Sequence, residues 1–171
     1  MKKYVDGQYI EMSDEEAGEV ERTCRIAEEL ERTRPMTESE VARMVIASQI
    51  NGIGMDDDTT LRCREFFPGW TCGAYTVGYT VQHVGNLWRC CQGHDSTGNP
   101  DWCPGNASSL WAPWHSKAAI TALPWVAPTG AHDAYMAGEY MVWTDGIVYK
   151  CMADNTVWGP DTLPGSWEVQ T

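Results

Sequence analysis

The stretch 79–90, YTVQHVGNLWRC, decides the fold of the C-terminal part of this chain, because its pattern returns at 140–151 as YMVWTDGIVYKC. Each copy is followed by a Trp-x-Pro triplet and, after six more residues, by another tryptophan. These tryptophans are Trp102 and Trp111 in the first copy and Trp158 and Trp167 in the second. An internal repeat of roughly 50–60 residues usually reflects one structural unit used twice. We therefore expect two copies of a small module.

Each copy has the pattern of short strands joined by turns. In the first copy, apolar and polar residues alternate over 75–77 and 79–83, as they do in half-buried strands. Residues 84–86 are expected to form a hairpin turn, and 87–91 the returning strand. The second copy has the same order over 140–151. The sequence therefore predicts two all-β modules in the C-terminal part.

The N-terminal residues have a different character. Tyr4 to Ile10 surround an Asp-Gly pair, which predicts a small hairpin. Ser13 and Glu16 then form a capping box that begins a helix over about 14–33. The apolar stripe of this helix is thin, and a helix this polar buries little by itself. We expect it to pair with copies of itself or to lie on a larger assembly.

Two more helices are expected before the first module. Pro35 ends the first helix, and a second capping box, Thr37 with Glu40, begins a helix that runs to about Asn51. Three aspartates at 56–58 precede a third helix, where their charge complements the helix dipole. A calcium site is the alternative, but the alternating ligands, the glycine and the distal glutamate of an EF-hand are missing.

Charge is unevenly distributed along the chain. The net charge is −12, and residues 1–66 carry 9 basic and 16 acidic residues, whereas 67–171 carry 3 and 8. An acidic chain without clustered Lys and Arg does not favour a nucleic-acid partner. The change in composition marks the main boundary. The expected segments are a hairpin at 1–12, a helical anchoring and oligomerisation region at 13–66, and β modules at 67–116 and 124–171.

The sequence contains no membrane or export signal that we recognise. No apolar run approaches the roughly 20 residues that span a bilayer, and the first residues lack the apolar core of a secretory signal. We therefore expect synthesis in the cytoplasm and no membrane partner.

The cysteines leave one alternative open. Seven cysteines cannot all pair internally, and reduced thiols are expected. The alternative is a zinc site, because Cys72, Cys90, Cys91 and Cys103 cluster in the sequence with His94. There is no CxxC pair, however, and the second copy keeps a single cysteine. No metal and no cofactor is predicted.

The repeated residues resemble carbohydrate-binding modules of families 5 and 12, which are chitin- and cellulose-binding appendages of bacterial hydrolases. The first copy offers Trp70, Tyr75, Gly78, Val81, Gly85, Trp88, Cys90, His94 and Trp111, and the second offers Trp125, Tyr135, Val142, Gly146, Tyr149, Cys151 and Trp167. The resemblance implies a compact three-stranded module twice. The fold class expected is α+β, with an N-terminal helical segment followed by two small three-stranded all-β modules.

The two copies depart from the family pattern in different places. The Gly-Asp pair of the family is Gly78-Tyr79 in the first copy, and in the second it is Gly138-Glu139 followed by one extra residue. The His-Thr loop is 93–96, GHDS, in the first copy, and it is missing from the second, where 154–156 stands. The second module is therefore expected to keep the fold, while its ligand stays an open question.

The layout of the whole chain resembles accessory proteins of tailed bacteriophages and prophages. The residues that carry this resemblance are the opening stretch 4–12, YVDGQYIEM, and the stretches 46–51 and 61–70. It implies a place in the virion tail, in contact with other tail proteins.

The aromatic residues divide into core and ligand candidates. Those expected in the core recur in both copies: Tyr79, Trp88, Trp111, Tyr140, Tyr149 and Trp167. An aromatic ring is a rigid surface for the apolar face of a sugar, and polar side chains nearby can bond its hydroxyls. The carbohydrate-binding candidates are Trp70, Trp102, Trp114, Trp143 and Trp158, with His94 and Asp95.

Catalysis is not expected, because His94-Asp95 has no nucleophile beside it and no carboxylate pair of a glycosidase is recognisable. The sequence predicts a non-enzymatic, homo-oligomeric tail protein that binds a bacterial surface polysaccharide or a peptidoglycan-associated glycan. Two alternatives stay open. One is a structural baseplate protein whose aromatic modules contact other proteins, and the other is the targeting subunit of a separate hydrolase.

Overall fold

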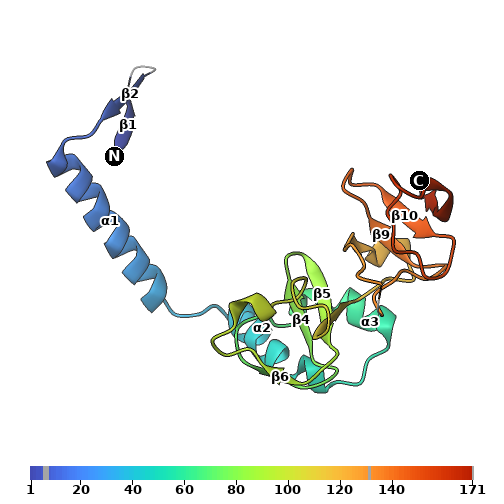
Figure 1. The fold of residues 1–171 in the computed structure, drawn as a ribbon. Coiled ribbons are helices and arrows are strands. Elements are labelled where there is room, and N and C mark those ends of the chain that lie inside the picture. The colour runs from blue at the N-terminus through green and yellow to red at the C-terminus, as the bar shows by residue number, and fades with distance from the viewer. Residues whose placement is uncertain (6–7, 131, 171) are drawn as a thin grey trace. The chain divides into compact units, whose positions relative to one another are not determined.

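The computed structural model describes residues 1–5, 8–130 and 132–170. The chain divides into two compact units, Met1–Val41 and Ala42–Thr171. Figure 1 shows the first unit in blue and the second from light blue to red. In the described residues, no helix combines the length and the apolar character that a membrane span requires.

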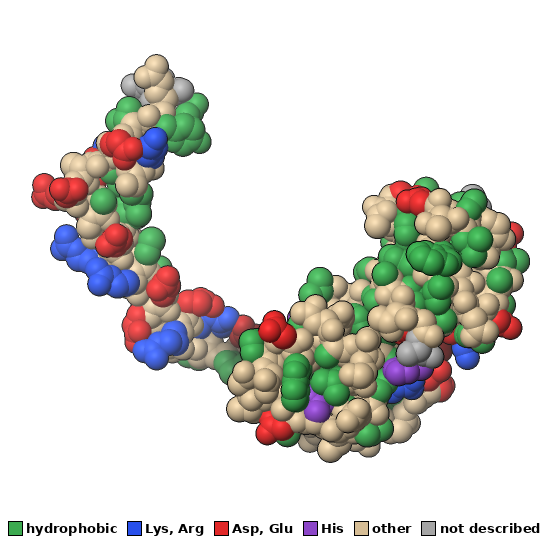
Figure 2. Space-filling model, in the orientation of Figure 1, with side chains coloured by type: hydrophobic (Ala, Val, Ile, Leu, Met, Phe, Trp, Pro, Cys, Tyr) green, Lys and Arg blue, Asp and Glu red, His purple; other side chains and the backbone are tan. Residues whose placement is uncertain are grey.

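The first unit is a hairpin followed by a long helix. Strands β1 (Lys2–Val5) and β2 (Gln8–Glu11) pair antiparallel, as predicted, and the expected Asp6-Gly7 turn lies outside the described residues. Helix α1 (Asp14–Thr33) matches the predicted span, and its capping box is formed as predicted. No residue of α1 is buried, and Figure 2 shows acidic, basic and hydrophobic side chains along it.

The helical segment that follows is built from local capping signals. Helix α2 (Glu38–Gln49) begins at the predicted second capping box, in which Thr37 N donates to Glu40 Oε2 at 2.7 Å. Helix α3 (Asp57–Arg62) begins at Asp56, whose carboxylate accepts from Thr59 N at 2.7 Å. Asp56 therefore caps the helix, and Asp57 and Asp58 lie in its first turn, where the dipole argument predicts acidic residues. Short 3₁₀ turns follow α2 and α3 at Ile50–Gly52 and Arg64–Phe66.

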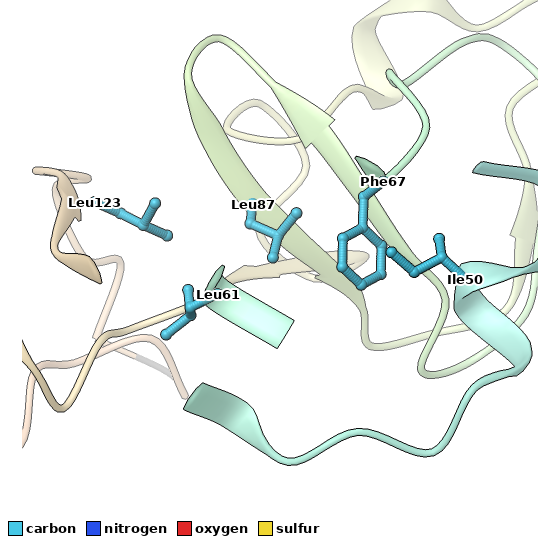
Figure 3. Close-up of a cluster of buried hydrophobic side chains, with 5 residues drawn as sticks. All are labelled: Ile50, Leu61, Phe67, Leu87 and Leu123. Carbon is cyan, nitrogen blue, oxygen red and sulfur yellow. The ribbon is translucent and has the colours of Figure 1, made fainter. Parts of the chain in front are cut away.

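One cluster of buried side chains joins this helical segment to the β strands. Leu61 of α3 packs with Leu87 of the first repeat and with Leu123 of the connection between the repeats. Burying each such side chain contributes about 1.5–3 kcal/mol, so this contact fixes α3 against the β region. Figure 3 shows the cluster as a row whose members are Leu123, Leu61, Leu87, Phe67 and Ile50.

The first repeat contains a three-stranded sheet and a separate strand pair. The sheet has the order β4-β5-β7, and β3 pairs with β6. Its core consists of Val81, Trp88, Cys90 and Trp111. The strands are β3 (Ala74–Tyr75), β4 (Thr80–His83), β5 (Asn86–Cys90), β6 (His94–Asp95) and β7 (Trp111–Pro113).

The second repeat forms a four-stranded sheet. Its order is β11-β10-β9-β8, and β8 pairs parallel with β9 while the other pairs are antiparallel. Its core is Tyr135, Met141, Cys151 and Trp167. The strands are β8 (Leu123–Pro124), β9 (Tyr140–Val142), β10 (Val148–Cys151) and β11 (Trp167–Val169).

The α+β class and the order of a helical part followed by a β-rich part agree with the prediction. The main sheets of the two repeats differ by one strand, because β8 joins the second sheet, and the prediction of two three-stranded modules is therefore not confirmed. The first repeat has the equivalent parallel contact as a single bridge between Gly69 and Gln82, so the two sheets differ in the length of this pairing.

Backbone hydrogen bonds show which residues of the repeats correspond. Gly78 and Gly138 each donate their N–H, at 2.8 Å, to the carbonyl oxygen of the buried cysteine that ends the return strand. Glu139, and not Tyr140, therefore takes the place of Tyr79. The predicted alignment of the two tyrosines was wrong by one residue, because the extra residue of the second copy lies in its hairpin turn and not before β9.

Candidate functional site

Two tryptophans of the second unit are exposed. The side chains of Trp102 and Trp158 are 41% and 59% exposed, while every other aromatic residue between 42 and 170 is buried or half-buried. Three of the rings predicted in the core, Trp88, Trp111 and Trp167, are confirmed there. The exposed rings are therefore confined to equivalent positions of the two repeats.

A hydrogen bond from a buried indole reaches the backbone of each exposed tryptophan. The indole Nε1 of buried Trp111 donates to the carbonyl oxygen of Trp102 at 2.9 Å. In the second repeat, Trp167 Nε1 donates to the carbonyl oxygen of Trp158, also at 2.9 Å. The buried indole N–H thus has its acceptor on the backbone of the exposed tryptophan. This bond holds that backbone in place, and the exposed ring lies at the surface.

His94 lies beside the first of these rings. Its imidazole centroid is 6.3 Å from that of Trp102 and 5.2 Å from that of Trp111. His94 Nδ1 lies 2.7 Å from the carbonyl oxygen of Gln92, which fixes the ring orientation. The structure therefore brings two of the predicted site residues, His94 and Trp102, together.

Asp95 follows His94 in β6 and is exposed. Hydrogen bonds from the side chain and the backbone of Thr97 lower the pKa of Asp95, and Thr97 N lies 2.9 Å from Asp95 Oδ1. The carboxylate is therefore charged at neutral pH and offers acceptor oxygens at the surface of the first repeat.

The three other predicted tryptophans occupy packed positions. Trp70 is half-buried against the core of the first repeat and meets His83 edge-on at 5.6 Å. Trp114 packs against the cluster around Leu61. The ring of Trp143 lies directly on Gly159, where any side chain would collide with it. These three rings are half-buried, in contrast to the exposed rings of Trp102 and Trp158.

The second repeat replaces His94 by other groups. Thr156 forms a bridge with Tyr135 where His94 pairs with Tyr75, and its hydroxyl donates to the carbonyl oxygen of Ala153 at 2.8 Å. An imidazole still packs on the core tyrosine, but it comes from the connection between the repeats. His115 stacks on Tyr135 with centroids 3.9 Å apart and an interplanar angle of 7°.

Sequence reasoning missed His115, because it lies outside the repeated pattern. Its Nδ1 is 2.9 Å from Glu139 Oε2, and the two side chains are 10% and 13% exposed. Since a carboxylate only accepts, Nδ1 carries the hydrogen. The nearest signal in the sequence was Glu139 itself, where the family has an aspartate.

The cysteines that suggested zinc do not converge. Within the described part of the chain, no three His, Cys, Asp or Glu side chains lie close enough together to hold a metal. Cys90 Sγ is 3.7 Å from His94 Nδ1, but Cys72 is exposed on its own. Burial raises the pKa of the Cys90 thiol, with a further contribution from Cys91. Cys90 therefore behaves as a small core residue.

Comparison with known proteins bears on this site. A search of curated proteins found no match. Residues 71–112 match the family model of carbohydrate-binding module family 5/12. The matched residues include His94, Trp102 and Trp111, and they end within β7. The first repeat is therefore similar to a carbohydrate-binding module of family 5/12, which supports carbohydrate binding by this part of the chain.

Proposed function

We propose that this chain is a non-enzymatic glycan-binding protein in which Trp102 and Trp158 are the sugar-binding surfaces. The observation that carries the proposal is the exposure of these two rings, each fixed through its carbonyl oxygen by a buried indole. Such a ring packs against the C–H face of a sugar, while nearby polar groups such as Asp95 bond its hydroxyls.

Two sites in one chain suit a ligand that binds each single site weakly. One aromatic ring on a sugar gives a small contact, but linked sites increase the overall affinity by raising the effective concentration. The second repeat lies outside the family match, yet it shares the hydrogen-bond arrangement around the exposed ring. We propose that it binds the same class of ligand.

The N-terminal helices would multiply these sites further. Helices α1 and α2 contain no buried residue, and apolar side chains such as Leu30, Met44 and Val45 are exposed on them. Exposed apolar side chains on a helix favour contact with a partner. The proposal is that this region forms a homo-oligomer and docks on other proteins, so that several pairs of sites face one surface.

The setting proposed is the tail of a bacteriophage or prophage, where the modules bind a bacterial surface polysaccharide or a peptidoglycan-associated glycan. This part of the proposal rests on the resemblance of the stretch 4–12 and of the overall layout.

The test is a pull-down of the intact protein with insoluble glycans and bacterial cell walls. Trp102→Ala and Trp158→Ala should each reduce the bound fraction, and the double variant should abolish binding. Ile120→Ala is the matched control, because Ile120 is an exposed apolar residue of the same unit outside both repeats. Unchanged binding by the double variant would refute the assignment of the two rings.

A structural role is the second candidate, favoured by the apolar surface of α1 and α2. Under that role, the aromatic modules contact other proteins of a baseplate. It predicts no retention on any glycan or cell wall, together with co-purification of a partner protein that depends on Trp102 and Trp158.

A further inference from the structure

A cavity of about 370 Å³ lies between the two repeats, within the second unit. Its volume is at the lower end of the range for small-molecule sites, about 300–1,000 Å³. The connection after strand β7 contributes Trp114, His115 and Lys117, and Arg89 comes from β5. On the side of the second repeat, the wall includes His132 and Glu139.

The basic residues of the β region gather at this cavity. Residues 67–171 contain only three Lys or Arg residues, and two of them, Arg89 and Lys117, line it. The third, Lys150, lies over the ring of Tyr140 at 5.9 Å and is not part of the wall. Figure 2 shows a histidine and basic side chains close together on one face of this unit. The cavity therefore holds two of the three cationic side chains of residues 67–171.

Two carboxylates of the wall, Glu139 and Asp57, equal Arg89 and Lys117 in number, so an anion site depends on where each charge lies. Glu139 Oε2 accepts from His115 Nδ1 and from Met136 N, both at 2.9 Å, so its charge is engaged within the protein. Asp57, at the start of α3, is the other acidic residue of the wall. None of the ion pairs among the described residues includes Asp57 or Lys117.

Several groups of the wall are held in place before any ligand arrives. The guanidinium carbon of Arg89 lies 5.1 Å from the ring centroid of Trp114. His115 is stacked on Tyr135 at 3.9 Å. At the edge of the cavity, Thr129 N donates to Asp133 Oδ2 at 2.7 Å, and the adjacent loop carries His132. A wall that is ordered beforehand loses less entropy when it binds.

We infer that this cavity binds an anionic group, a carboxylate or a phosphate, carried by a sugar. A guanidinium lying on an aromatic ring keeps its N–H edge free for two parallel hydrogen bonds to such a group, and Lys117 adds a mobile positive charge. That the anion belongs to a glycan rests on the proposed function, whereas the anion site itself does not. The cavity would recognise charged substituents, and the exposed tryptophans would recognise apolar sugar faces.

The test is a titration of the full chain, followed by calorimetry and by NMR of the indole N–H signals. Inorganic phosphate, glycerol phosphate and glucuronate are the anionic probes, and methyl glucoside is the neutral one. Because a hydrogen bond to a charged group is worth about 1.5–3 kcal/mol, Arg89→Gln and Lys117→Gln should each weaken anion binding at least about tenfold. Lys150→Gln is the matched control and should change the affinity less than about twofold, the typical effect of a distant surface charge.

Asp57→Asn gives a second, opposite readout. Removing this negative charge should strengthen anion binding, whereas it would weaken binding at a cation site. Phosphate and glucuronate arms distinguish a phosphate-bearing from a carboxylate-bearing glycan. Trp102→Ala should leave anion binding unchanged, so loss of the tryptophan sites and loss of the cavity site are separable results.

Two outcomes would overturn the inference. One is the absence of binding by all three anionic probes at millimolar concentration. The other is an equal loss of affinity in Lys117→Gln and Lys150→Gln, which would mean non-specific attraction to surface charge.

Discussion

At the scale of single residues, tryptophans that recur in the same way in the sequence differ in their exposure in the structure. Trp102 and Trp111 both recur in the second repeat, yet the first is exposed and the second is 1% exposed. The indole of the buried ring bonds the backbone of the exposed one. A buried indole N–H needs an acceptor, and the carbonyl oxygen of the exposed tryptophan supplies it.

The turn of the first hairpin contains a residue in an unfavourable conformation. Val84 has φ 47° and Gly85 has φ 75°, a pair typical of a two-residue hairpin turn that prefers Asn-Gly. A β-branched residue at positive φ is strained. We expect Val84→Asn to raise the free energy of unfolding by about 1 kcal/mol, measured by denaturant titration.

Val77→Asn is the control for this change, because Val77 is also exposed but is not at positive φ. It should not stabilise the protein. A stabilisation equal to that of Val84→Asn would show that polarity, and not backbone strain, is responsible.

Gly159 is required by the ring above it. A Cβ at this position would overlap the ring of Trp143. Gly159→Ala should destabilise the second unit by about 1–3 kcal/mol, as overpacking does, and should shift the near-UV circular dichroism of the tryptophans. Gly165→Ala is the control, because nothing lies within 4 Å of a Cβ there; an equal loss in both variants would contradict the steric explanation.

At the scale of elements, the helices begin where local signals place them. The capping boxes at Ser13 and Thr37 are both formed. A capping box is formed by two residues three positions apart, so it forms without tertiary contacts. The strands depend on pairing, and the shift of one residue between the repeats became visible only from hydrogen bonds.

The second capping box predicts that the stability of the start of α2 depends on pH. Hydrogen bonds from Arg34, and then from Thr37, lower the pKa of Glu40 from 4.5 to about 2. A depressed pKa in the folded state stabilises the helix start above the ordinary pKa, and this stabilisation is lost as the pH falls. The amide protection of residues 37–40 should therefore decrease between pH 4.5 and about 2.

Glu40→Gln is the comparison for this experiment. The variant should have lower amide protection at neutral pH and should lose the pH dependence in that range. The same pH profile in both proteins would mean that another carboxylate, such as Glu31 beside Arg34, is responsible.

At the scale of the whole molecule, one cluster connects parts of the chain that are distant in sequence. Leu61 is 2% exposed and packs with Leu87 and Leu123 (Figure 3). We expect Leu61→Ala to reduce the stability of the second unit by about 2–5 kcal/mol, the range for such a truncation in a core. Both repeats should then unfold at a lower denaturant concentration, as followed by tryptophan fluorescence.

Leu163→Ala provides the control, because Leu163 is exposed in the second repeat. It should have little effect. If Leu61→Ala lowered the stability of the first repeat alone, the cluster would not couple the two repeats. The His115–Glu139 contact would then have to maintain the cavity between them.

The sequence by itself determined the helix starts, the hairpin in each repeat, the order of helical and β-rich parts, and the resemblance of the first repeat to a carbohydrate-binding module. These features depend on residues close together in the chain. Only the tertiary structure decided which tryptophans are exposed, that His115 stacks where the second repeat lacks a counterpart of His94, and that Arg89 and Lys117 share a cavity. The physical reason is that exposure and charge clustering depend on contacts between distant segments, whereas caps and turns are fixed by near neighbours.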